Sequence, residues 1–218
     1  MNSTEFRLGV AAAAALAMFG MPGAASAESV SLAARAGTTG LGLEAGFRVT
    51  ESINLRLGYY SLDYGTDIEE EGIEYDGDLR LRNAALFADW HPFRGLFRLS
   101  SGVVQSGNEF VGSAEDELEV GDNTYDGTLE ATVDWDGMAP YLGIGFGNAM
   151  RGGRWSLLLD LGVMFTGSPG VRLDGEVNDP SLEDAFREDL EREEAALRED
   201  LSDAKYYPVL SVGVAYRF

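Results

Sequence analysis

The last eight residues of the chain, 211–218, alternate strictly between two kinds of side chain. Val212, Val214, Tyr216 and Phe218 would point to one face of an extended strand, and the small or polar residues between them to the other. The final residue is a bare aromatic, which is unusual for a strand of a soluble protein. This period of two predicts a strand that lies between an apolar and a polar environment.

The first 27 residues have the pattern of a secretory signal peptide. Arg7 begins a short basic region, residues 8–19 are almost unbroken apolar sequence, and residues 25–27 form an Ala-Ser-Ala cleavage site. The apolar run is too short for a membrane-spanning helix, which needs about 20 residues. We therefore expect residues 1–27 to be cleaved and residues 28–218 to form one domain. The alternative is a buried N-terminal helix.

Composition narrows the fold and excludes several functions. The chain has no cysteine, which rules out disulfides and thiolate chemistry. Its formal net charge of −21 excludes nucleic acid as a partner, because phosphate binding needs clustered Lys and Arg. No long apolar stretch follows Ala27. An exported chain without helical spans that ends in an amphipathic strand can satisfy its backbone in lipid only as a closed barrel.

Eight segments alternate in this way and are separated by turn residues: 30–37, 41–49, 53–60, 79–90, 97–108, 140–147, 155–166 and 207–218. They predict an all-β fold, an eight-stranded antiparallel up-and-down transmembrane β-barrel. The fourth segment is the least regular, and we expect a bulge near Ala84 and Ala85. Turns near 50, 92 and 148–154 are short and are predicted to be periplasmic. The long connections after 60, 108 and 166 are predicted to be extracellular loops.

Aromatic residues collect near the ends of these segments, as expected for the two girdles of a membrane barrel. Seven lie near the predicted periplasmic rim: Phe47, Trp90, Phe93, Phe97, Trp155, Tyr216 and Phe218. Four lie near the predicted outer rim: Tyr59, Tyr141, Phe165 and Tyr207.

Charged residues also fall on the inward face of the segments. The predicted lumen network consists of Arg35, Glu44, Arg48, Arg56, Asp89, Arg98, Asp160 and Arg217. A barrel of this size is filled by side chains, so these charges should pair with one another. One interpretation is a structural ionic core. The other is a narrow polar conduit for small solutes, supported only by the inward Gly143, Gly145 and Gly147, which more simply leave room for arginines.

Acidic residues are concentrated in the predicted extracellular loops. Segments 63–78, 109–136 and 174–203 hold 31 of the 37 acidic residues. Such runs are usually solvated. They can also attract divalent cations or cationic small solutes, or bridge to lipopolysaccharide phosphates through such cations. Residues 122–127 resemble the start of a calcium loop, but its twelfth position is Val133 instead of glutamate, so we predict no metal site.

The last of these loops is predicted to contain an α-helix over residues 181–204. Ser181 and Asp184 form a variant of the capping box. Apolar residues recur at helical spacing at Leu182, Phe186, Leu190, Leu197 and Leu201. The helix could lie across the mouth of the barrel as a lid, pair with another copy, or remain a solvated helix.

Several motifs resemble those of known outer-membrane proteins. Ser211, Gly213, Tyr216 and Phe218 resemble the terminal strand that such barrels present to the barrel-assembly machinery. The eight segments resemble small barrels of the OmpA membrane-anchor and OmpW kind. The turn at residues 89–93 (DWHPF), the FRLS that follows it and the Tyr-Pro at 207–208 are similar to the proteobacterial group that includes ornithine-uptake porins.

The resemblance implies a location in the Gram-negative outer membrane, in contact with its lipid and lipopolysaccharide, and a structural or small-solute, porin-like role. Some eight-stranded barrels are enzymes that modify lipid A, and hydrolytic ones need a serine activated by histidine. The only histidine, His91, falls at a predicted periplasmic turn, away from the outer leaflet. We therefore predict no catalytic residue and no cofactor. A lipid A-modifying enzyme and an adhesive surface barrel that binds divalent cations without conducting remain alternatives.

Overall fold

The computed structural model describes residues 30–70, 73–121 and 123–218, so the predicted signal peptide lies outside the described residues. The chain forms nine strands and one long helix in the described part. The strands are β1 (Val30–Gly37), β2 (Gly40–Arg48), β3 (Ile53–Glu70), β4 (Ile73–Trp90), β5 (Phe97–Val120), β6 (Asn123–Phe146), β7 (Trp155–Phe165), β8 (Gly170–Val177) and β9 (Tyr206–Arg217). The helical elements are η2 (Pro180–Leu182), α1 (Glu183–Asp200) and η3 (Leu201–Asp203).

Eight of the strands close into an antiparallel barrel, which confirms the predicted fold. Neighbours in sequence pair from β1 through β7, and β9 then pairs with both β7 and β1. The closing register places Leu32 opposite Tyr216 and Arg35 opposite Gly213. Strand β8 is not part of this ring. It pairs only with the outer half of β6, from Gly127 to Asp134.

The strands differ greatly in length, and this was not predicted. β5 and β6 have 24 residues each, whereas β1 and β2 have eight and nine. At about 3.3 Å per residue a 24-residue strand reaches about 80 Å, several times the apolar band of about 25 Å that such barrels present to lipid. The first two connections predicted as long loops are therefore wrong as loops. They are hairpins that continue the barrel strands outward.

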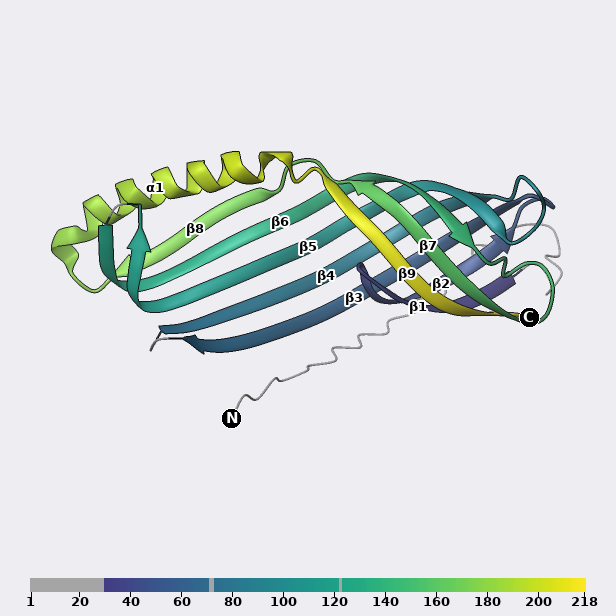
Figure 1. Ribbon diagram of the computed structural model, residues 1–218, viewed down its shortest axis with the longest axis horizontal. Coiled ribbons are helices and arrows are strands. Elements are labelled where there is room, and N and C mark those ends of the chain that lie inside the picture. The colour runs from purple at the N-terminus through teal and green to yellow at the C-terminus, as the bar shows by residue number, and fades with distance from the viewer. Residues whose placement is uncertain (1–29, 71–72, 122) are drawn as a thin grey trace, which may run out of the picture.

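We call the described residues of 61–82, 107–136 and 170–203 the extension, and the end of the barrel from which it rises the outer end. The opposite end, where β1 begins and β9 ends, is the terminal end. Figure 1 shows β3 to β6 and β8 running on beyond the short strands β1, β2, β7 and β9. The predicted bulge in β4 is wrong, because β4 pairs with β3 without interruption from Ile73 to Trp90.

The outer surface of the barrel is apolar. Large side chains stand exposed along every barrel strand, among them Leu57 at 58% and Leu157 at 76%. Their neighbours in sequence face the lumen, where Arg56 and Leu158 are buried. This alternation matches a wall between acyl chains and a filled interior. No helix in the described chain is long and apolar enough to cross a membrane.

Aromatic side chains lie at both ends of this apolar surface. At the terminal end, Tyr216 makes edge contacts with Trp155 and Phe218, at centroid distances of 5.0 and 5.3 Å. At the outer end, Phe165 packs against Tyr206 at 5.7 Å, and Tyr59 is exposed.

Two residues assigned to the outer girdle are placed differently. Tyr141 is 3% exposed and points into the lumen, where it contacts Phe87, because it shares its face with the inward Gly143. Tyr207 is half-buried, and its hydroxyl donates to the Thr38 carbonyl oxygen at 2.6 Å. These two girdle assignments are therefore wrong.

The polarity of the two strand faces reverses in the extension. In the barrel part of β4, Leu86 points outward and Asp89 inward. In its extension part, Arg80 and Arg82 are exposed on the outer face, whereas Leu81 on the inner face is buried. A face that meets water carries polar side chains, so the apolar residues of the extension lie on its inner face. This change of phase makes the fourth segment look irregular in sequence.

The predicted helix is present and packs on the inner face of the extension. It runs lengthwise beside β8, so the interpretation as a lid across the mouth is wrong (Figure 1). The capping prediction is also wrong. The side chain of Asp179 accepts from the Ser181 backbone N–H at 2.9 Å at the start of η2, and α1 itself has no side-chain cap.

Candidate functional site: a charged network across the lumen

Six charged side chains from six strands meet inside the barrel. They are Arg35 of β1, Glu44 of β2, Arg56 of β3, Asp89 of β4, Arg98 of β5 and Asp160 of β7. Each occupies an inward position of its strand, and each is at most 7% exposed. The network contains three positive and three negative groups, so its formal charges balance.

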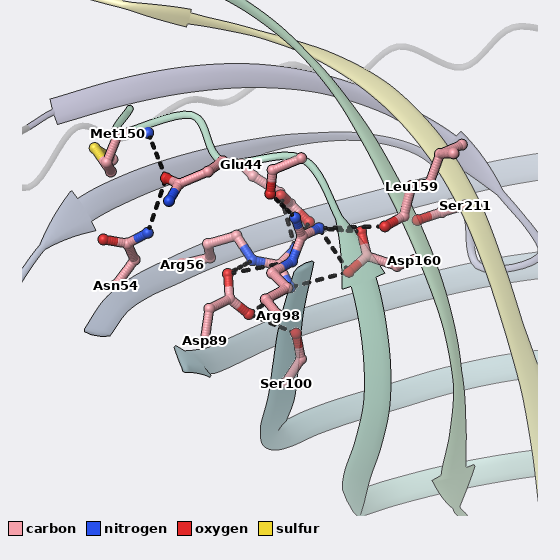
Figure 2. A network of polar contacts seen from close by, with 12 residues as sticks. Glu44, Asn54, Arg56, Asp89, Arg98, Ser100, Met150, Leu159, Asp160 and Ser211 are labelled. Atoms are coloured by element: carbon pink, nitrogen blue, oxygen red, sulfur yellow. Dashed lines mark hydrogen bonds and ion pairs between the residues drawn. The ribbon is translucent and has the colours of Figure 1, made fainter. Parts of the chain in front are cut away.

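Arg56 lies at the centre of this lumen network (Figure 2). Its Nε and Nη2 donate to the two carboxylate oxygens of Asp89 at 2.6 and 3.0 Å. Its Nη1 donates to both oxygens of Glu44 at 2.9 and 3.0 Å. The guanidinium carbon lies 4.8 Å from the ring centroid of Phe87. Arg56 therefore makes two bidentate contacts, which a lysine could not reproduce.

Asp160 joins the other two arginines to the network. Arg98 Nη2 lies 2.8 Å from both oxygens of this carboxylate. Arg35 donates to Asp160 and, at 2.8 Å, to the hydroxyl of Ser211. Arg56 Nη2 reaches the same carboxylate at 3.4 Å. One carboxylate thus faces three guanidinium groups.

Glycines on the inward faces leave room for the arginines. A Cβ atom on Gly145 would lie 2.6 Å from Arg98 Nε, and one on Gly213 would lie 2.5 Å from Arg35 Cδ. Both distances are too short for a real contact. Gly145 of β6 and Gly213 of β9 therefore leave room for two arginines of the network, as predicted, and Gly143 leaves room for the Tyr141 hydroxyl.

The structure does not bring Arg48 and Arg217 into the network. Both are partly exposed near the terminal end. Arg217 donates to the carbonyl oxygens of Met150 and Gly152 at 3.1 and 2.7 Å. No ion pair of Arg48 is found within the described residues. Strand parity put both on the correct face but did not give their depth along the barrel.

Three uncharged residues that were not predicted as members of the network complete the site. The hydroxyl of Ser100 donates to Asp89 at 2.6 Å, Tyr60 donates to Glu44, and Ser211 accepts from Arg35. The sequence signal for them was the same inward parity. Ser211 was selected only as part of the predicted assembly signal.

An apolar layer fills the lumen on the outer side of the network. It consists of Tyr60, Ala85, Phe87, Val104, Ala139, Tyr141, Met164 and Val209, with Tyr207 packed against it. All eight are less than 9% exposed. The lumen is therefore filled first by charges and then by apolar side chains.

Two small cavities of about 20 Å³ flank the network. The first lies toward the terminal end and is lined by Asn54, His91 and Asn148, and the second lies toward the apolar layer. Glu44 and Arg56 line both. A volume of this size holds one or two water molecules and no larger solute.

The other predicted sites are placed as follows. In β9, Ser211 and Gly213 face the lumen and Tyr216 lies on the outer face at the terminal end, where it contacts Phe218, the residue after the strand. Their use as an assembly signal stays a prediction. Within the described residues, no group of three or more His, Cys, Asp or Glu side chains is arranged to hold a metal ion.

Comparison with known proteins identifies the fold. No protein-family model matches the chain, and no curated protein sequence matches it. Among solved structures, the chain is similar to CarO2 and CarO of Acinetobacter baumannii, with TM-scores of 0.62 and 0.59 and 22% identity to each. Each match covers 87% of this chain and 98% of the other. A major outer membrane protein of Thermus thermophilus matches with a TM-score of 0.45, 17% identity and coverage of 87% and 99%. The chain has the fold of small outer-membrane β-barrels.

Proposed function

We propose that this protein is a closed outer-membrane barrel of the Gram-negative envelope whose main role is to anchor and present the acidic extension at the cell surface. The observation that carries this proposal is the filling of the lumen. All six charged groups of the network are at most 7% exposed, and the apolar layer fills the lumen between them and the outer end. In an open pore such groups would be in contact with water.

The exposed apolar surface of the barrel supports insertion in a membrane, in contact with lipid and lipopolysaccharide. In this proposal the signal peptide of residues 1–27 directs export, and the terminal strand β9 is recognised by the barrel-assembly machinery. The terminal end then faces the periplasm and the extension faces outward. The acidic surface of the extension would meet divalent cations, lipopolysaccharide phosphates bridged by them, or other cationic groups.

Single-channel recording in planar bilayers tests the closed state. Purified refolded protein is expected to give no stepwise current at moderate voltage, whereas a solute-filled pore would give discrete steps. Regular conductance steps from the wild-type protein would contradict the proposal. Heat-dependent migration in gels checks that the tested protein is folded.

A small-solute conduit is the second candidate, and the two cavities favour it. They share Glu44 and Arg56, so displacement of the Arg56 side chain would join them. The apolar layer would still close the outer side, so this candidate also requires that layer to move. It predicts stepwise current from the wild-type protein, and the cation selectivity of that current would show whether the acidic extension concentrates cations at the mouth. Silent bilayers with folded wild-type protein would exclude this candidate.

Our proposal includes no catalytic step. His91 is buried beside Asn54 and Asn148 near the terminal end, at the opposite end from the leaflet that holds lipid A. Mass analysis of lipid A after overexpression is expected to show no change in its acyl chains. Any new lipid A species that depends on this protein would replace the anchoring role with an enzymatic one.

A further inference from the structure

At its tip, the inner face of the extension is covered by α1. Phe186 is 2% exposed and packs against Leu118, Val120 and Tyr125, with a centroid distance of 5.0 Å between the rings of Phe186 and Tyr125. Leu190 packs against the same cluster. An amphipathic helix on this sheet face is therefore an established interface of the molecule.

Closer to the barrel, α1 lies at the edge of the sheet instead of over it. Glu194 accepts a hydrogen bond from the Leu173 backbone N–H at 3.0 Å, and Arg198 donates to the Val171 carbonyl oxygen at 3.0 Å. These bonds satisfy the free edge of β8. They also hold the helix away from β3 and β4, as Figure 1 shows.

Among the described residues, no helix packs on the inner face of β3, β4 and the part of β5 nearer the barrel. Two rows of inner-face residues cross it, Tyr64–Leu79–Phe110 and Thr66–Gly77–Gly112, and we call these six residues the uncovered strip. Phe110 is 45% exposed and Tyr64 is 39% exposed. Tyr64 and Phe110 flank Leu79 in one row across three neighbouring strands, so their exposed surfaces form one apolar patch, which favours a binding surface.

The uncovered strip has the shape of a shallow trough. A Cβ atom on Gly77 would meet only Thr66 and Phe110, at 3.6 Å and beyond, and one on Gly112 would meet only Phe110, at 3.5 Å. The row Thr66–Gly77–Gly112 has small side chains and therefore lies deeper than the row that contains Tyr64 and Phe110. Two strand spacings amount to about 10 Å, which is the diameter of a helix with its side chains. One further helix therefore fits beside α1.

The negative charge around the strip favours a binding partner with positive charge. The segments 61–82, 107–136 and 170–203, to which the extension belongs, hold 31 acidic residues against six arginines. On α1, which lies beside the strip, Glu188, Glu191 and Glu193 are exposed. A helix with acidic side chains would be repelled here, and a helix with lysines or arginines would be attracted.

We propose that the uncovered strip binds a cationic amphipathic helix of a peptide partner, which packs beside α1 on the inner face of the extension. Its apolar side covers Tyr64, Leu79 and Phe110, and its cationic side faces the surrounding carboxylates. The inference rests on the proposed function, in which the extension is the surface-exposed, interacting part of the protein.

Binding of a designed peptide tests this directly. The probe is a fluorescent Lys–Leu peptide of 18 residues, the length of α1, with its leucines at helical spacing. Two control peptides carry Glu in place of Lys, or the same composition without helical spacing. Anisotropy is measured with the protein in phosphatidylcholine nanodiscs, and empty nanodiscs report partitioning into lipid. Only the cationic amphipathic peptide is expected to bind above the empty discs, more weakly at higher salt.

Variants on the two faces of the same strand locate the site. Phe110→Ser with Tyr64→Ser is expected to weaken binding about tenfold or more, because two apolar anchors are lost. Gly112→Val fills the trough with a residue that favours strands and should abolish binding without loss of fold. Val111→Ser lies on the opposite face and is the matched control, expected to leave binding within about twofold.

Equal binding by wild type and the Gly112→Val variant would overturn the proposal. So would equal binding of the cationic and anionic peptides, or a strip-dependent dimer that excludes the peptide, since the occupant would then be a second copy. Planar-bilayer recordings of the same purified protein distinguish failure of the proposed closed barrel from failure of the proposed peptide site. Conductance of the wild type refutes the closed barrel, whereas silent bilayers without peptide binding refute only the role of the uncovered strip.

Discussion

The barrel and the extension are built from the same strands but have opposite polarity. In the barrel, Leu57 faces outward and Arg56 inward. In the extension, Arg80 faces outward and Leu81 inward. Backbone pairing continues across this change without a break in register. The comparison shows that the surroundings of the outer face, lipid or water, decide which face of a continuous strand is apolar.

The interiors of the two regions differ accordingly. The barrel is filled by ion pairs among three arginines and three carboxylates, with an apolar layer beside them, whereas the extension buries Phe186 and Tyr125 between a helix and the sheet. Ion pairs in a low-dielectric lumen tolerate no loss of a partner.

The largest effect is expected for removal of a lumen carboxylate. Asp160→Ala would leave Arg35 and Arg98 without their main partner and should destabilise the barrel by about 3–5 kcal/mol. Asp136→Ala, an exposed position of the extension, should change stability by less than about 0.5 kcal/mol. Urea unfolding in micelles, followed by heat-dependent gel migration, measures both. Similar losses for the two variants would refute the difference between the regions.

The second-largest effect is expected for truncation of Phe186, the buried aromatic residue of α1. Phe186→Ala removes the side chain that packs on Tyr125. It is expected to make the free energy of α1 docking on the sheet about 3 kcal/mol less favourable. The loss should be local, so hydrogen exchange of α1 rises while unfolding of the barrel is unchanged. Phe186→Leu serves as the conservative control. A parallel fall in barrel stability would show that the two regions unfold as one unit.

A charge on the lipid-facing surface should have a somewhat smaller effect. Leu161 is 57% exposed on the outer face of β7, and Leu161→Arg is expected to destabilise the barrel by about 2–3 kcal/mol in a bilayer. Glu130→Arg on the outer face of the extension should be tolerated because that face meets water. Folding efficiency into vesicles distinguishes the two. Equal tolerance would place both residues outside the lipid.

The smallest effect is the pH dependence of α1 docking. Hydrogen bonds from Tyr125, at 2.5 Å, and Asn123, at 2.7 Å, lower the pKa of Asp189 below its ordinary value of 3.8. The same bond to Asp189 raises the pKa of Tyr125 above 10.0. Docking should therefore be strongest between about pH 4 and pH 10. It should weaken as Asp189 is protonated below this window and as Tyr125 ionises above it.

Hydrogen exchange or limited proteolysis of α1 across pH measures this window. Asp189→Asn should dock more weakly at neutral pH and lose the acid limb, and Tyr125→Phe should lose the alkaline limb. If docking of the Asp189→Asn variant still weakens at low pH, the loss must come from protonation of other carboxylates. In none of these variants is the barrel expected to unfold within the window.

Strand parity in the sequence selected the side chains that meet in the lumen, because inward positions of a closed barrel converge whatever the details of the loops. It gave no depth along the barrel, so Arg48 and Arg217 were grouped with the network although they lie near the terminal end. Tyr141 was assigned by its position near a strand end, although its parity with Gly143 indicated the lumen.

The extension was harder to predict from the sequence. Carboxylates such as Glu109, Asp134 and Glu130 lower the hydrophobic contrast and resemble solvated loops. The alternation continues in the extension, but the apolar residues switch from the outer to the inner face. A prediction that keeps the apolar residues on one face therefore ends each strand where this switch occurs. Strand β8 and its pairing with β6 left no separate signal, because the strand has only eight residues and runs into the acidic segment 174–203.

The sequence alone determined the closed antiparallel barrel, the apolar outer face and the charges that point inward, since these follow from the period of two and the need to satisfy every backbone group in lipid. Only the tertiary structure decided which charges pair, how far the hairpins extend and where α1 lies. Those features depend on contacts between residues that are distant in the chain, such as Arg35 with Asp160 and Tyr125 with Phe186.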